Sequence, residues 1–126
     1  MNKQEIYKIN DVVTMRYYAI PQELFENPLY ANLNLAAKIL YAFLLDRLTL
    51  SQQHNWVNQN NEVYLIFTRE EAMKKLNISK PTITNAFKQL VANRLIIEQR
   101  QSLGRPNLIF VCKILSRHVK STHQET

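Results

Sequence analysis

The chain has 126 residues, 46% hydrophobic and 21% charged, which is typical of one globular domain that buries a core. Its longest apolar run, Ile39 to Leu45, is too short to cross a bilayer, and no signal-peptide core is present. The single cysteine, Cys112, excludes an internal disulfide. We therefore expect a cytoplasmic protein with no membrane partner. The net charge is +6, but residues 1–63 carry five Lys/Arg against six Asp/Glu and residues 64–126 carry eleven against four, which indicates an anionic partner, nucleic acid above all, or else a solvated basic surface.

The first half of the chain predicts an extended arm followed by a central helix. Residues Asp11 to Ile20 are β-branched and aromatic, which favours an extended segment that ends at Pro21, and a short helical turn follows. Asn34 is placed to cap the strongest helix of the chain, because its side-chain oxygen can accept from a free amide of the first turn. The helix is apolar nearly all round between Ile39 and Leu45, so we expect it to be buried.

The middle of the chain predicts a hairpin and a short capped helix. Trp56-Val57 and Val63 to Phe67 flank an Asn/Gln-rich turn, which favours a β-hairpin. Thr68 and Glu71 have the spacing of a capping box, in which each side chain satisfies a backbone amide of the other. We expect the helix that they open to end at Asn77.

A second helix follows after a tight turn, with Ser79 as its cap and Pro81 in its first turn, where the amides have no helical partner. Five apolar residues recur at the spacing of one buried helix face: Ile83, Ala86, Phe87, Leu90 and Val91. Residues 95–101 and 107–115 then predict two strands. Gly104, the one glycine of the chain, lies between them, where a turn requires positive φ.

This order of elements predicts an α+β fold, a winged helix-turn-helix with a two-stranded wing and an extra N-terminal extended segment or hairpin. We expect the domain to cover residues 1–115. Residues 116–126 have almost nothing to bury and are expected to form a polar tail or the start of a linker.

The outward face of helix 80–93 is the candidate reading surface for DNA. Its side chains are short, hydrogen-bonding or cationic, and no acid occurs between Lys80 and Ile97. Such side chains can pair with base edges in the major groove or contact phosphate. The alternative is a plain solvated face. The candidate residues are Lys80, Pro81, Thr82, Thr84, Asn85, Lys88 and Gln89.

The predicted wing adds a second candidate contact with DNA. Arginines on a hairpin tip are suited to phosphate contact or entry into the minor groove; the alternative is solubilising charge on a hairpin edge. Lys74, on the helix before the turn, is a further candidate for phosphate contact. The wing residues are Arg100, Gln101, Ser102, Arg105 and Asn107.

The sequence does not favour an enzymatic function. His54, His118 and His123 are scattered without metal-ligand spacing, and one glycine cannot form a glycine-rich phosphate loop. Cys112 lies in an apolar strand pattern and is expected to be packing rather than a nucleophile. We therefore expect no enzymatic activity, no metal site and no cofactor.

The chain resembles the N-terminal domain of the RepA_N family of plasmid replication initiators over about Tyr17 to Ile114. The resemblance is carried by "AAKILYAFLLDRL", "VYLIFT" and "LGRPNLIFV" in this order, and the turn "NQNN" departs from relatives that usually have a glycine and acids there. The resemblance implies a winged-helix domain that binds repeats (iterons) of double-stranded DNA at a plasmid origin, usually as a homodimer. It also implies that host replication proteins are recruited through a separate C-terminal domain, which nothing in this sequence matches.

Two alternatives to origin binding remain open at this point. A winged helix can serve a transcriptional regulator, which differs only in the DNA site bound, or can dock a protein partner. The β-prone arm "VVTMRYYAI" has no obvious partner strand, and an exposed strand edge tends to be paired or covered. We expect this arm to join either the core of its own domain or a second subunit.

Overall fold

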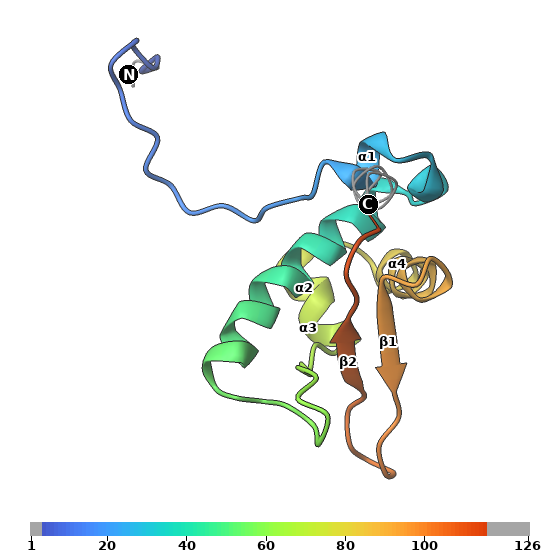
Figure 1. Ribbon diagram of the computed structural model, residues 1–126. Coiled ribbons are helices and arrows are strands. Elements are labelled where there is room, and N and C mark those ends of the chain that lie inside the picture. The colour runs from blue at the N-terminus through green and yellow to red at the C-terminus, as the bar shows by residue number, and fades with distance from the viewer. Residues whose placement is uncertain (1–3, 116–126) are drawn as a thin grey trace, which may run out of the picture.

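Helices pack against a small antiparallel sheet in the computed structural model, which describes residues 4–115 (Figure 1). The predicted α+β winged helix-turn-helix is confirmed, and the predicted tail, residues 116–126, lies outside the described range. The elements in chain order are α1 (Glu23–Glu26), η1 (Pro28–Tyr30), α2 (Leu35–Gln53), α3 (Arg69–Leu76), α4 (Lys80–Ala92), β1 (Ile96–Gln99) and β2 (Leu108–Val111). No helix of the described residues is long and apolar enough to cross a membrane.

Helix α2 is the buried centre of the domain, as its apolar sequence predicts. Asn34 caps it, since the Asn34 side-chain oxygen accepts from the Ala37 amide at 2.9 Å. Leu40 and Leu44 are completely buried and belong to the same core cluster as Phe87 of α4. The cap therefore fixes where the helix begins, and burial of its sides accounts for most of its stability.

The turn between α3 and α4 confirms one predicted cap and corrects two. Asn77 ends α3 in the left-handed conformation, with φ of 57°. Thr68 accepts from the Glu71 amide at 3.1 Å, but the Glu71 carboxylate pairs with Arg47 at 2.6 Å instead of returning to Thr68, so the capping box is one-sided. Ser79 occupies the N-cap position of α4 without accepting from a backbone amide, because its hydroxyl lies 3.0 Å from that of Thr82.

The wing is a hairpin of β1 and β2, which are shorter than the two strands predicted. The strands are antiparallel, with Glu98 opposite Ile109. Gly104 has φ of +84°, as the predicted turn requires. The predicted hairpin at residues 56–67 is present but short: Val57 and Val63 form its one bridge, and backbone hydrogen bonds run from Tyr64 to Trp56 and from Asn58 to Glu62. Leu65, at its end, pairs with Ile109, which adds this segment to the edge of β2.

The N-terminal arm extends away from the rest of the domain (Figure 1). Every side chain from residue 4 to residue 19 is exposed, including Ile9 at 97% and Val12 at 76%. Arg16 and Tyr17 line a pocket together with Asp46 and Lys75, and the Tyr18 ring stacks on Phe43 with 3.9 Å between centroids. Packing on its own domain, one of the two outcomes expected for the arm, therefore applies from about Arg16 onward.

Two buried side chains hold the C-terminal end of the described chain. The Asn27 amide donates to the Leu115 carbonyl at 2.9 Å, and the Leu115 amide donates to the Tyr30 hydroxyl at 3.1 Å. Both backbone groups of Leu115 are thus satisfied by η1 and the residue before it. The clasp places the end of the described chain beside α1, at the end of the molecule opposite the wing turn (Figure 1).

Tyr41 of α2 links the core to the sheet. Its hydroxyl donates to the Cys112 carbonyl at 2.6 Å, and its side chain is 2% exposed. Burial, helped by the neighbouring Cys112 and Tyr30, raises the pKa of Tyr41 from 10.0 to about 12, because the phenolate would lose its hydration.

This shift predicts that the domain loses stability in alkali. The unfolded chain releases the Tyr41 proton near pH 10 and the folded chain only near pH 12, so the stabilisation is complete below pH 10 and is lost as the pH rises through 12. Urea unfolding of the parent chain across this range should show the decline. Tyr41→Phe, although less stable at neutral pH, should show a shallower one. Tyr64→Phe, at a half-buried tyrosine whose hydroxyl makes no hydrogen bond among the described residues, should decline like the parent.

Candidate nucleic-acid interface

Helix α4 presents five of the predicted reading residues to solvent. Ile83, Ala86, Phe87 and Leu90 are completely buried, and at about 100° per residue they fix the opposite side of the helix as its outer face. The exposed side chains are Lys80, Pro81, Thr82, Asn85 and Lys88. This face combines an amide, a hydroxyl and two ammonium groups on a helix of 13 residues.

The structure places three residues of α4 differently from expectation. Gln89 is half-buried, and its side-chain oxygen accepts from the Asn34 amide at 2.8 Å, so it holds α4 against the start of α2. Thr84 is half-buried on the flank of the outer face. Val91, expected on the buried face, is 43% exposed because it lies at the edge of the apolar stripe.

The wing carries its polar groups around the Gly104 turn. Arg100, Ser102 and Arg105 are exposed, and Asn107 is half-buried. Gln101 is half-buried and braces the turn, since its amide donates to the Pro106 carbonyl at 2.8 Å. Its predicted role in DNA contact is therefore combined with a structural one.

Leu103 at the wing tip is fully exposed and was not among the predicted site residues. An apolar side chain at the tip of a hairpin stabilises nothing within its own fold. The signal that could have found it is its place next to the only glycine between two strands.

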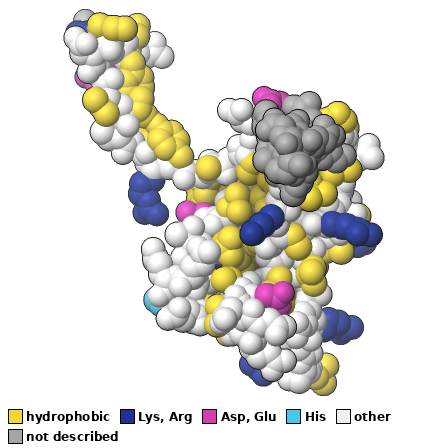
Figure 2. All heavy atoms as spheres, in the orientation of Figure 1, with side chains coloured by type: hydrophobic (Ala, Val, Ile, Leu, Met, Phe, Trp, Pro, Cys, Tyr) yellow, Lys and Arg dark blue, Asp and Glu magenta, His cyan; other side chains and the backbone are white. Residues whose placement is uncertain are grey.

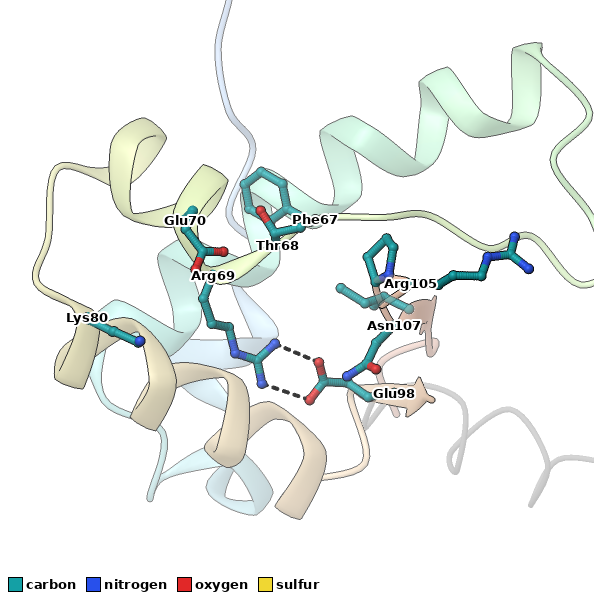
Figure 3. A pocket seen from close by; sticks show the side chains of 10 residues that line it. Phe67, Thr68, Arg69, Glu70, Lys80, Glu98, Arg105 and Asn107 are labelled. Carbon is teal, nitrogen blue, oxygen red and sulfur yellow. Dashed lines mark hydrogen bonds and ion pairs between the residues drawn. The ribbon is translucent and has the colours of Figure 1, made fainter. Parts of the chain in front are cut away.

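A pocket of about 320 Å³ lies between the start of α3, the first turn of α4 and the wing (Figure 3). Residues from α3, α4 and the wing line it, and these include Thr68, Arg69, Lys80, Glu98, Arg105 and Asn107. In Figure 3 the Arg69 and Glu98 side chains point toward each other across the pocket, whereas the Arg105 guanidinium points away from it. Lys80 and Arg105 form no ion pair in the described part of the chain.

Arg69 is the residue of this region that sequence reasoning missed. Its guanidinium donates to both carboxylate oxygens of Glu98, at 2.7 and 3.1 Å, and its central carbon lies 3.8 Å from the centre of the Phe87 ring. Glu98 is 29 residues away in the sequence, and no local pattern predicts a pair at that separation.

Cationic side chains follow the edge formed by α4 and the wing (Figure 2). Lys74 and Lys75 add two exposed ammonium groups from the last turn of α3. Two acids, Glu70 and Glu98, border the pocket, but the charge of Glu98 is neutralised by Arg69. Within residues 4–115, no group of three His, Cys, Asp or Glu side chains could hold a metal ion.

Comparison with known proteins identifies the family. The family described as "Replication initiator protein A (RepA) N-terminus" matches residues 16–124. The chain belongs to this RepA_N family. Its fold agrees with that of solved relatives: a structure described as "N-Terminal domain of DNA binding protein" is 30% identical with a TM-score of 0.74, and covers 98% of this chain and 95% of its own.

Two further structures resemble the RepA_N domain. One, described as "Structure of Rep-DNA complex", is 34% identical with a TM-score of 0.72 over 87% of this chain and 86% of that chain. The other, described as "Structure of MDR initiator", is 33% identical with a TM-score of 0.69 over 88% and 90%. A "41 kDa protein" of Lactobacillus helveticus is 23% identical over 80% of this chain, which spans 29% of that relative's length.

The contact of Gln89 with Asn34 predicts a difference in stability between Gln89 and the exposed candidate residues of α4. Gln89→Ala removes the acceptor of the Asn34 amide and should lower the free energy of unfolding by about 1 kcal/mol. Asn85→Ala, at an exposed position of the same helix, should leave it unchanged within about 0.5 kcal/mol. Chemical denaturation of both variants measures the difference, and equal stabilities would contradict a structural role for Gln89.

Proposed function

We propose that this domain binds double-stranded DNA repeats at a plasmid replication origin. Helix α4 reads base edges in the major groove, and the wing contacts the neighbouring backbone or minor groove. The observation that carries this proposal is the outer face of α4, on which Lys80, Thr82, Asn85 and Lys88 are exposed without an acid among them. A helix exposed only to solvent more often mixes acids with lysines.

The roles of the residues follow from their chemistry. Asn85 is suited to bidentate pairing with adenine, Thr82 to a base edge or a thymine methyl, and Lys88 to guanine or phosphate. Arg100 and Arg105 supply charge to the backbone, and Lys74 adds a phosphate contact beside the helix. Membership of the RepA_N family and likeness to a protein described in complex with DNA support the proposal.

A protein-docking winged helix is the second candidate, favoured by the exposed apolar tip at Leu103. The salt dependence of the binding affinity distinguishes DNA binding from protein docking. DNA affinity falls linearly with salt on logarithmic axes because phosphate contacts release counterions, whereas an apolar interface shows little dependence. A transcriptional regulator would differ only in the site bound, and protection of an origin fragment from cleavage would yield the repeat and its spacing.

Substitutions in the two elements should have different effects on DNA binding. Asn85→Ala should cost about 1–3 kcal/mol on a duplex selected from a random-sequence library and much less on a scrambled duplex, because it removes a base contact. Gln53→Ala, an amide at the far end of α2, is the control. If Asn85→Ala and Lys88→Ala together leave binding unchanged, α4 is not the reading helix.

The wing cations should act on all sequences alike. Arg105→Ala should weaken binding to the selected and scrambled duplexes by similar factors and reduce the salt slope by about one. Lys113→Ala removes the same charge from the groove beside α2 and should leave the slope unchanged. A loss confined to the selected duplex would instead make Arg105 a base reader.

We further propose that the domain forms a homodimer through its arm, and that host replication proteins are partners of a longer protein containing this domain. The arm supports dimerisation, because residues 4–17 are exposed and include Ile6, Val12, Val13 and Met15. Figure 2 shows this apolar surface running along the arm. Removal of residues 1–15 should shift the chain from dimer to monomer in sedimentation equilibrium, and an undiminished dimer would exclude the arm from the interface.

A further inference from the structure

Arg69 joins three elements that are far apart in the sequence. It is the first residue of α3, its guanidinium covers the Phe87 ring of α4 at 3.8 Å, and both of its terminal nitrogens donate to Glu98 of β1. A guanidinium fork paired with a carboxylate fixes direction as well as distance, because two parallel hydrogen bonds allow little rotation. The contact of Arg69 with the Phe87 ring and its two hydrogen bonds to Glu98 therefore fix the angle between α4 and the start of the wing (Figure 3).

Glu98 is an unusual residue for this place. It is the first acid after the acid-free stretch that contains α4, and its side chain is 17% exposed at the pocket between the helix and the wing. A carboxylate beside a DNA-binding surface opposes phosphate binding. A carboxylate at this position is explained if it serves a structural purpose. Among residues 4–115, its one ionic partner is Arg69.

The tip of the wing depends on this contact more than its base does. Ile96 and Ile109 are buried in the core at the base, and the Tyr41 hydroxyl donates to the Cys112 carbonyl there, whereas residues 99–100 and 102–106, beyond Glu98, are exposed. Glu98 is the last residue of β1 whose side chain is hydrogen-bonded to a helix, among the described residues. The next side-chain hydrogen bond along the hairpin, from Gln101 to the Pro106 carbonyl, is internal to the wing. On the other strand, Leu65 pairs with Ile109, directly across from Glu98.

We propose that Arg69 and Glu98 are positioning residues for DNA recognition: their ion pair on Phe87 sets the wing at a fixed angle to α4 before DNA binds, and neither side chain contacts DNA. This inference rests on the proposed DNA binding. The pair reduces the cost of ordering the wing upon binding, which is a gain in affinity by pre-organisation. The gain appears on duplexes that engage α4 and the wing together, and not on those bound through charge alone.

Glu98→Gln tests this inference by the sign of its effect. Glutamine has nearly the same shape but offers one acceptor oxygen, so the paired hydrogen bonds cannot form. If Glu98 only repels phosphate, its neutralisation should tighten binding to every duplex. We expect instead about fivefold weaker binding to the selected duplex, with no weakening on the scrambled one.

Glu70→Gln is the matched control. Glu70 lines the same pocket, is exposed, and makes no ion pair or side-chain hydrogen bond in the described chain. Its neutralisation should leave binding to both duplexes equal or tighter. The proposal is overturned if Glu98→Gln behaves like Glu70→Gln on the selected duplex.

Arg69→Lys keeps the net charge but removes the guanidinium group and therefore its two parallel hydrogen bonds to Glu98. It should weaken binding to the selected duplex to a similar degree while the salt slope stays unchanged, because no phosphate contact is lost. The double variant Arg69→Lys, Glu98→Gln should bind no more weakly than either single variant, since both remove the same contact. Additive losses, or a lower slope for Arg69→Lys, would make Arg69 a direct phosphate ligand and overturn the positioning role.

A distance measurement without DNA separates this inference from the proposed function. Spin labels on Ser102→Cys at the wing turn and Gln53→Cys at the end of α2, in a Cys112→Ala background, report the angle of the wing. Glu98→Gln should broaden the distribution of label distances, and Glu70→Gln should not. An unchanged distribution for Glu98→Gln overturns the positioning role even if the parent binds DNA. If the parent binds no duplex, the proposed function fails, but this measurement still shows whether the ion pair fixes the angle of the wing.

Discussion

Packing of α4 on α2 is the constraint on which the rest of the structure depends. Ile83, Ala86, Phe87 and Leu90 form a completely buried stripe, and α2 supplies Leu40 and Leu44 to the same core. Rotation of α4 by one residue would bury a polar side chain and expose an apolar one. The burial of one face thus determines which side chains the other face presents to solvent.

Much of this arrangement was predictable from the sequence because it depends on local patterns. The Asn34 cap, the end of α3 at Asn77, the Gly104 turn and four of the five predicted inward residues of α4 are each fixed by neighbours within a few positions. Two of the errors lie where a side chain has a distant partner. Glu71 was expected to complete a local cap and pairs with Arg47, while Gln89 was expected outside and holds the Asn34 amide.

The same reasoning explains why the site was predicted only in part. Exposed polar residues on a helix follow from its periodicity, and the outer face of α4 was obtained in this way. The pocket between α4 and the wing is formed by Arg69 and Glu98, which meet because three elements fold together. An ion pair between positions 29 apart requires the tertiary structure, and no local pattern in the sequence links the two residues.

The clasp on Leu115 has a consequence for how such a domain can be used. Since Asn27 and Tyr30 hold both backbone groups of that residue, a segment that follows it starts from a fixed point beside α1, and the arm also leaves from that end. The wing turn lies at the opposite end of the molecule (Figure 1). A segment attached behind the clasp therefore leaves the domain at the end opposite the wing turn, so different segments can be attached there without a change at the wing.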